Sequence, residues 1–143
     1  MKIDHPDELA FGMLGYFAGK VADNAVQISG VSDMDRRQCK SLCGGMGTSG
    51  RCGKFILGNQ TSNTEKIDFD KKEMQKIHDE LNTADKGDVI TLGSPQLGLK
   101  EIADLSWLLR GREFTKRCMV FCPRSVQEQA RNLGYTNEIE RAG

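Results

Sequence analysis

Residues 88–102, DVITLGSPQLGLKEI, constrain the fold of this chain more than any other stretch of the sequence. The apolar run 88–92 is typical of a buried strand, Gly93-Ser94-Pro95 of a tight turn, and the apolar spacing from residue 98 onward of a helix. The turn therefore follows the carboxyl end of a strand and precedes the amino end of a helix. Open α/β proteins bind ligands at such positions, where the N–H groups that open a helix attract anions.

Composition excludes several classes of protein. The 143 residues suit one domain. The 20 basic residues balance the 20 acidic residues, so nothing favours nucleic acid or an anionic membrane as a partner. No apolar run approaches the roughly 20 residues of a membrane span, and the N-terminus lacks the apolar core of a signal peptide. We therefore expect a cytoplasmic protein.

Hydrophobic periodicity predicts alternating helices and strands. Helices are expected at 6–22, 33–42, 70–81, 98–110 and 124–133, with a further helical turn from Asn137, and strands at 25–28, 54–57, 88–92 and 118–122. Ser32 or Asp33 is expected to cap the second helix, and Gly111 and Gly134 to end the last two helices in left-handed conformations. Three glycines inside the first helix, Gly12, Gly15 and Gly19, suggest close approach to a neighbouring backbone.

The second half of the sequence alternates strand, helix, strand, helix. This order implies an α/β fold with a parallel sheet and right-handed crossovers. A doubly wound domain would continue with a strand beyond Gly143, so we expect an unpaired sheet edge. Such edges pair with other chains, which makes a homo-oligomer a possible state.

A glycine-rich loop is expected from Gly44 to Gly53. Residues 45–50 match G-x-G-x-x-G, but a helix precedes them and a strand follows, which is the reverse of the order in a dinucleotide site. The simpler interpretation is a flexible loop with no binding role. The functional one is a substrate loop, in which Gly47 and Gly50 let backbone N–H groups approach a carboxylate or phosphate and Thr48 and Ser49 add hydroxyl donors.

The five cysteines of the chain, an odd number without a secretion signal, argue against a disulfide framework. Cys39 and Cys43 lie one helical turn apart and could share an ion, with Cys52 as a third ligand. Cys118 and Cys122 lie about 13 Å apart on a strand and cannot share one. Free cysteines packed as small hydrophobes are the favoured state, and no metal site is assigned.

Two strand-end turns, Ser94-Pro95-Gln96 and Cys122–Ser125, form the stronger functional candidate. If their strands are neighbours, then Ser94, Gln96, Arg124 and Ser125 converge near one crevice. Arg124 suits bidentate contact with a carboxylate or phosphate. The alternative is plain helix capping by the two serines with a solvated Arg124. No side chain stands out as a general base, so no catalytic residue is assigned.

Four segments in register resemble the aconitase X family. Residues 89–102 are similar to its Leu-Gly-(Cys/Ser)-Pro-His-x-Ser-x-x-Glu-(Leu/Ile) signature. Leu14-Gly15-Tyr16 with Gly19-Lys20 resembles its Leu-Gly-Tyr…Gly-Lys helix, Thr48–Gly50 its Ser-Ser-Gly loop, and Val120–Arg124 its Cys-Thr-x-Arg turn. The likeness spans roughly residues 8–143.

The resemblance implies an aconitase-like layered parallel sheet flanked by helices, in a partial core domain over residues 1–143. Within it, a helix and glycine-rich loop region would cover 8–66 and a strand–helix alternating region 67–143. The family consists of hydro-lyases that dehydrate small hydroxy acids such as cis-3-hydroxy-L-proline and 5-phosphomevalonate. It uses an iron–sulfur cluster, and a swivelling domain or small subunit completes its site.

Departures from the family pattern shape the functional expectation. Ser94 occupies the position of a possible cluster cysteine, and serine is a poor iron–sulfur ligand. Gln96 replaces a histidine and cannot shuttle a proton near neutral pH. We therefore expect a portion of a dehydratase that binds an anionic hydroxy acid through Gly47–Gly50, Ser94–Gln96, Arg124 and Ser125, holds no cluster by itself and is inactive alone. The alternative is a non-catalytic anion-binding or assembly module.

Overall fold

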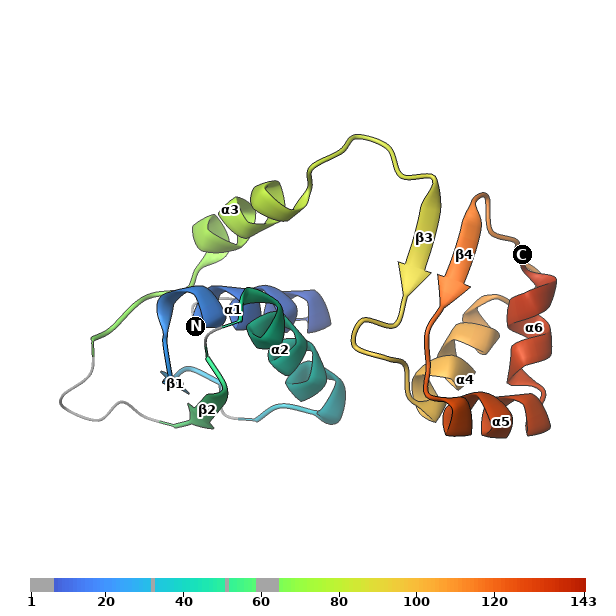
Figure 1. The fold of residues 1–143 in the computed structure, drawn as a ribbon, viewed down its shortest axis with the longest axis horizontal. Helices are drawn as coiled ribbons and strands as arrows, with labels where there is room; N and C mark the ends of the chain where they lie inside the picture. The colour runs from blue at the N-terminus through green and yellow to red at the C-terminus, as the bar shows by residue number, and fades with distance from the viewer. Residues whose placement is uncertain (1–6, 32, 51, 59–64) are drawn as a thin grey trace. The chain divides into compact units, whose positions relative to one another are not determined.

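A computed structural model describes residues 7–31, 33–50, 52–58 and 65–143. The chain divides into two compact units, Met1–Thr83 and Ala84–Gly143. Figure 1 shows the elements of each unit, labelled in chain order. The expected internal division at 66/67 lies inside the first unit, ahead of the helix that ends it.

The first unit contains three helices and a two-stranded sheet among its described residues. In chain order they are α1 (Glu8–Val21), β1 (Ala25–Ile28), α2 (Arg36–Ser49), β2 (Lys54–Leu57) and α3 (Lys71–Leu81). β1 pairs with β2 in parallel, with Ala25 opposite Lys54 and Ile28 opposite Leu57. Both strands have the bounds predicted from the sequence, and α1 and α3 begin within two residues of their predicted starts.

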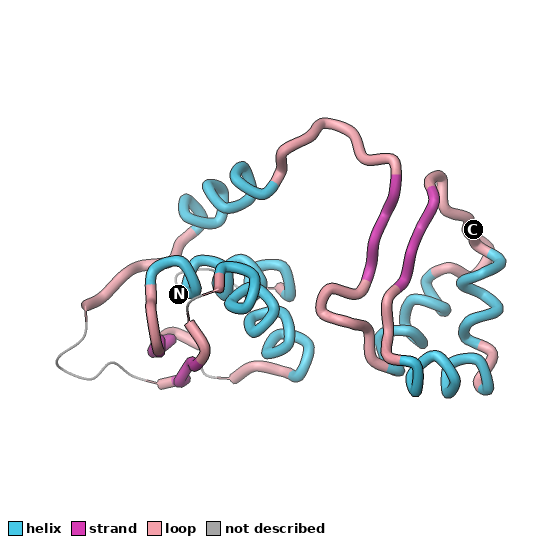
Figure 2. Tube along the Cα trace, in the orientation of Figure 1, coloured by secondary structure: helices cyan, strands magenta, loops and turns pink. Residues whose placement is uncertain are grey.

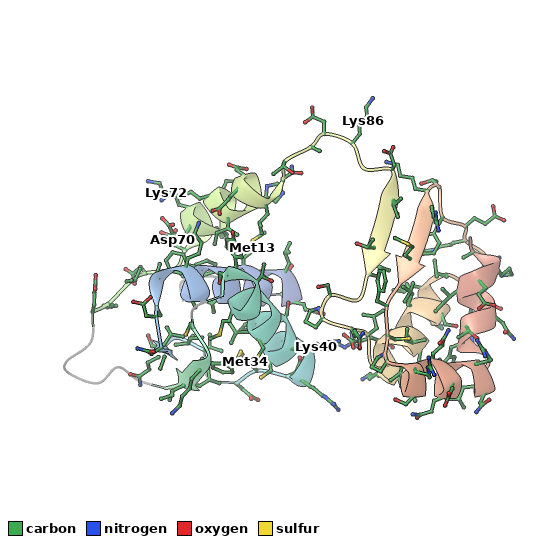
Figure 3. All side chains as sticks on the ribbon, in the orientation of Figure 1. Met13, Met34, Lys40, Asp70, Lys72 and Lys86 are labelled. Atoms are coloured by element: carbon green, nitrogen blue, oxygen red, sulfur yellow. The ribbon has the colours of Figure 1, made fainter. Side chains whose placement is uncertain are left out.

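Aspartates begin each helix of this unit. Asp7 accepts a hydrogen bond from the Ala10 N–H at 2.8 Å, and Asp70, labelled in Figure 3, accepts one from Lys72 N–H at 2.9 Å. Asp35 and Gln38 form a capping box at the start of α2. The predicted cap Asp33 lies outside the helix, so that prediction is wrong, and Ser32 lies outside the described residues.

α1 and α2 pack through their glycines. A Cβ placed on Gly15 would lie 2.1 Å from the Leu42 carbonyl oxygen, and one on Gly19 would lie 2.8 Å from the Met46 carbonyl oxygen. Only a hydrogen side chain allows the two backbones to approach this closely. The close approach predicted from the glycines of the first helix is confirmed.

The expected glycine-rich loop 44–53 is wrong over residues 44–49, because α2 continues to Ser49. Glycine weakens a helix by about 1 kcal/mol relative to alanine, and this penalty suggested a loop. The contact with α1 reverses the outcome, since Gly45 fits against the Gly12 carbonyl where no larger residue could lie. The helix ends at Gly50, which is left-handed with φ +92°.

The apolar core of the first unit lies between these helices and β1. Phe11 and Leu42 are its largest fully buried side chains, and Phe69 and Ile77 bring α3 and the segment before it onto the core. The Phe17 and Phe69 rings lie 5.4 Å apart at 42°, a tilted geometry that aromatic pairs favour.

The second unit contains β3 (Val89–Leu92), α4 (Leu99–Leu108), β4 (Arg117–Val120), α5 (Arg124–Asn132) and α6 (Tyr135–Arg141). β3 and β4 lie side by side in Figure 2 and pair in parallel, with Val89 opposite Arg117 and Leu92 opposite Val120. The predicted strand–helix alternation and parallel pairing are confirmed. Gly111 and Gly134 have φ of +68° and +78°, as predicted for the residues that follow α4 and α5.

The helices of the second unit bury residues mainly against one another. Ile102, Leu109, Ala130 and Ala142 are buried, whereas Val89 of β3 is 42% exposed. The C-terminal helix is tied to the end of α4, because Arg141 Nη2 donates to the Leu109 carbonyl oxygen at 2.9 Å. Within the described residues, no helix combines the length and apolarity that crossing a membrane requires.

Candidate functional site

The turns after β3 and β4 lie at the same edge of their sheet and bond to each other. The Phe121 N–H donates to the Leu92 carbonyl oxygen at 2.7 Å, which extends the pairing by one residue. The Leu97 N–H then donates to the Phe121 carbonyl oxygen at 2.9 Å. The carboxyl ends of the two parallel strands therefore carry one joined pair of turns, in the position where α/β proteins bind ligands.

Gly93 allows the two turns to approach. Its φ is +113°, and a Cβ on it would lie 2.2 Å from the Phe121 carbonyl oxygen. The backbone of the first turn therefore rests directly on the backbone of the second. The following bond, Ser94–Pro95, is cis.

The five predicted binding residues of this unit lie on the two turns and are exposed: Ser94, Pro95, Gln96, Arg124 and Ser125. Arg124 and Ser125 open α5, after the N-cap residue Pro123. The first amides of a helix have no carbonyl to bond within it, and Pro123 offers no side-chain cap. This end of α5 thus combines a positive helix terminus with a guanidinium group.

The neighbouring helix terminus differs in its electrostatics. The Glu101 carboxylate accepts the Gly98 N–H at 2.7 Å at the start of α4. A negative charge of the chain itself therefore lies at this helix terminus. An external anion is favoured at α5 rather than at α4.

The predicted substrate loop 47–50 lies at the other end of a helix. Thr48 Oγ1 donates to the Gly44 carbonyl oxygen at 2.9 Å, and Ser49 Oγ donates to those of Gly45 and Met46 at 3.3 and 3.2 Å. The Gly50 N–H donates to the Met46 carbonyl oxygen at 3.1 Å. These donors are used within α2, whose C-terminal end carries partial negative charge. An anion-binding role for this segment stays a prediction.

The three cysteines of the first unit lie in different surroundings. Cys39 and Cys43 lie one turn apart on α2, whereas Cys52 is buried and its thiol donates to the Lys54 carbonyl oxygen at 3.3 Å. All five cysteines are free. Across the described ranges, no three His, Cys, Asp or Glu side chains lie close enough to hold a metal ion.

A hollow of about 370 Å³, which was not predicted from the sequence, lies between β4 and the helices of the second unit. Its lining includes Cys118, Val120 and Cys122 together with Ile102 and Ala130. Alternate residues of a strand share a face, so the spacing of 118, 120 and 122 was the available signal. Burial raises the pKa of the Cys118 thiol. None of the predicted binding residues lines this hollow.

Two family models cover the whole chain. The aconitase X second-domain model matches residues 1–86, and the aconitase X third-domain model matches residues 87–143. The chain belongs to the aconitase X family. The resemblance inferred from four short motifs is confirmed, and the two models meet close to the division between the compact units.

Similar curated proteins are phosphomevalonate dehydratase large subunits of archaea. The one from Methanocaldococcus jannaschii is 28% identical over 95% of this chain, and the one from Methanosarcina mazei is 31% identical over 95%. The chain spans 37% of the length of the first of these relatives and 36% of the second.

A solved structure has the same fold. The crystal structure of Thermococcus kodakaraensis aconitase X in its holo-form matches with a TM-score of 0.84 and 24% identity, covering 99% of this chain and 40% of that one. The predicted aconitase-like α/β fold is therefore confirmed for this portion of the family.

The donor set of this chain does not fit the iron–sulfur cluster that the resemblance implies. Such clusters are held by several thiolates, whereas the two strand-end turns carry one thiol, that of Cys122, beside the Ser94 hydroxyl. The described residues bring together no trio of ligand side chains. No step of the chemistry below is therefore assigned to a cluster bound by these residues.

Proposed function

We propose that this chain is a portion of a hydro-lyase that eliminates water from a small anionic hydroxy acid, and that its own part is to bind the substrate. The observation that carries the proposal is the joined pair of turns after β3 and β4, with the Leu97 N–H bonded to the Phe121 carbonyl at 2.9 Å. The names of two archaeal relatives support this substrate class, since they are phosphomevalonate dehydratase large subunits.

The second unit supplies the groups for anion binding. The Arg124 guanidinium would contact a carboxylate or phosphate bidentately, and the first amides of α5 would add donors along the helix dipole. Ser94 and Gln96, with Pro95 between them, lie on the adjoining turn and would orient the hydroxyl-bearing part of the substrate. A hydroxyl and an amide are too weakly basic to take a proton near neutral pH, so these residues would bind the substrate rather than act as a base.

The first unit would contribute less to substrate recognition. The amides and hydroxyls of Gly47–Gly50 are used inside α2. Thr48 and Ser49 would then contribute oxygen lone pairs to a substrate hydroxyl rather than donors to an anion.

The remaining parts of the enzyme would come from elsewhere. Elimination needs a base and a group that accepts the departing hydroxyl. We propose that a small subunit and further large-subunit residues would supply these two groups, together with the iron–sulfur cluster of the family. On this proposal the 143-residue chain binds substrate in the cytoplasm but has no turnover by itself.

A second candidate is a non-catalytic anion-binding or assembly module with the same fold. Gln96 favours it, because it stands where the resembling family has a histidine. The module would keep the anion site on α5 and perform no elimination.

Binding and turnover are tested separately. In calorimetric titrations with phosphomevalonate, Arg124→Gln should weaken binding about tenfold or more, the loss of a charge-assisted pair. Arg131→Gln, in the last turn of the same helix, is the matched control and should bind as wild type does. Equal affinities for the two variants would contradict the binding site.

Turnover is then assayed anaerobically with the small subunit and the remaining large-subunit segment of the Methanosarcina mazei relative. Restored dehydration supports the proposal that the chain is a portion of an enzyme. Binding without dehydration supports the non-catalytic module instead.

A further inference from the structure

Two side chains of α1 converge on one carboxylate of α3. The Tyr16 hydroxyl donates to Glu80 Oε1 at 2.9 Å, and Lys20 Nζ donates to Oε1 at 2.9 Å and to Oε2 at 2.7 Å. The ammonium also lies 5.5 Å from the centre of the Tyr16 ring, within cation–π range. Both oxygens of the carboxylate thus receive donors, and one oxygen receives two.

The donors are positioned by one helix and the acceptor by another. Tyr16 and Lys20 are four residues apart on α1, the spacing that places side chains next to each other on a helix face. Glu80 is 60 residues further along the chain than Lys20. Rotation of the Glu80 side chain would therefore vacate the donor pair without any change in α1.

Packing of α3 does not depend on this contact. Ile77 is buried and Met74 packs against the core of the first unit, and these residues hold α3 in place. The Lys20 and Glu80 side chains are each 45% exposed. An exposed pair of this kind contributes little to stability, and a dissolved anion can reach its donors.

Two other ion pairs among the described residues are built differently. Lys76 with Glu73 and Arg141 with Glu138 each join residues three apart on one helix. Neither recruits a hydroxyl or an aromatic ring in the contacts that the structure gives. The Tyr16–Lys20 pair instead offers a hydroxyl donor, a full positive charge and an aromatic ring beside a single oxyanion.

We propose that Tyr16 and Lys20 form a binding site for a compact oxyanion, a carboxylate or a phosphate monoester, which Glu80 occupies as an intramolecular ligand. The site does not depend on the dehydratase function proposed above. The electrostatics agree with this role, since hydrogen bonds from Lys20 and then Tyr16 lower the pKa of Glu80, and the hydrogen bond to Glu80 raises the pKa of Lys20.

Occupation of the site by Glu80 should weaken the binding of an added anion to the wild-type chain. A ligand that binds only the vacated pair has its apparent affinity reduced by the fraction of molecules in which the pair is vacant. Removing the carboxylate should therefore reveal binding that wild type shows only weakly. Glu73→Ala is the matched control for Glu80→Ala, because it removes one carboxylate from the same helix and alters net charge equally.

The experiment titrates inorganic phosphate and, separately, acetate into each full-length variant and follows the Tyr16 ring and Lys20 Nζ signals by NMR. Glu80→Ala should bind one of these anions about tenfold or more tightly than wild type and Glu73→Ala do. Tighter phosphate binding assigns the site to phosphate monoesters, and tighter acetate binding assigns it to carboxylates. Adding Lys20→Met to Glu80→Ala should remove the gain, and adding Tyr16→Phe should reduce it.

Equal affinities of Glu80→Ala and Glu73→Ala would overturn the proposal and leave a simple ion pair between helices. Tighter anion binding that persists when Lys20→Met is added to Glu80→Ala would overturn it as well. The wild-type chain provides a measurement that needs no variant: added phosphate or acetate should move the Glu80 carboxyl carbon signal and leave that of Glu73 in place. Unmoved or equally moved signals for both anions would contradict displacement.

Discussion

The Gly12 carbonyl oxygen lies 2.1 Å from the point that a Cβ on Gly45 would occupy. This contact places the backbones of α1 and α2 against each other and explains a helix that runs through Gly44, Gly45 and Gly47. The helix also carries the segment 47–50, so the contact decides that these residues form a helix terminus instead of a loop.

Gly45→Ala should therefore destabilise the chain. Overpacking against backbone costs about 1 to 3 kcal/mol or more, while alanine returns at most about 1 kcal/mol of helix propensity. Gly47→Ala is the control, since no atom outside its own helix lies within 4 Å of its Cβ position. It should raise stability by about 0.5 to 1 kcal/mol. Urea unfolding followed by circular dichroism measures both, and equal stabilities would contradict the close helix contact.

Gly93→Ala should separate the two strand-end turns. It combines φ +113° with a Cβ position 2.2 Å from the Phe121 carbonyl oxygen, and strain of this kind costs about 1 to 3 kcal/mol. Gly134→Ala, at φ +78° with open space around its Cβ, should cost only the left-handed strain of about 1 to 2 kcal/mol.

The local readout is hydrogen exchange at the Leu97 amide, which bonds to the Phe121 carbonyl. Exchange should accelerate in Gly93→Ala and stay unchanged in Gly134→Ala. Retained protection in Gly93→Ala would show that the turns are held together by something other than this backbone contact.

Local patterns predicted most elements of the fold. Short apolar runs bounded by polar residues gave β1 and β2 with their observed bounds, and the alternation after residue 87 gave the parallel pairing of β3 and β4. Features that depend on distant residues were not predictable in this way. The length of α2 follows from contact with α1, and the Tyr16–Glu80 contact joins residues 64 apart.

The same distinction between local and distant determinants applies to the candidate site. The adjacency of the two turns followed from the order of strands and helices, because parallel neighbours end at one edge. The Glu101 carboxylate at the start of α4 depends on side-chain packing that periodicity does not encode. The hollow beside Cys118 was signalled only by the alternate spacing of residues 118, 120 and 122. The strand-end turns were therefore predicted from the sequence. The electrostatic difference between the starts of α4 and α5 was not.

The thiols should react in an order set by burial and pKa. Cys43 is exposed, whereas Cys52 is buried and hydrogen-bonded. Burial raises the Cys118 pKa, which lowers its thiolate fraction at any given pH, and the thiolate is the reactive form. Pulse alkylation with mass spectrometry should label Cys43 first and Cys118 and Cys52 later. Labelling in urea is the control, where all should react alike; equal rates in buffer would contradict the packing of Cys52 and Cys118.

The contact between α1 and α3 should weaken in acid and in strong alkali. The folded-state pKa of Glu80 is lowered by hydrogen bonds from Lys20 and Tyr16, so its contribution to stability is present above its unfolded pKa and is lost as pH falls through the lower folded value. The hydrogen bond to Glu80 raises the pKa of Lys20, so that contribution is complete below the unfolded pKa of lysine and is lost as pH rises through the higher folded value.

Unfolding of wild type and Lys20→Met should therefore differ most across the neutral range and converge as the pH falls below the ordinary range of glutamate. Added salt should narrow the difference, because screening weakens exposed charge pairs. Lys76→Met, which breaks the pair with Glu73 inside α3, is the control. It should leave the Glu80 titration, followed by carboxyl carbon NMR, at its lowered position, whereas Lys20→Met should return that titration toward the ordinary range of glutamate. An unshifted Glu80 in wild type would contradict the contact.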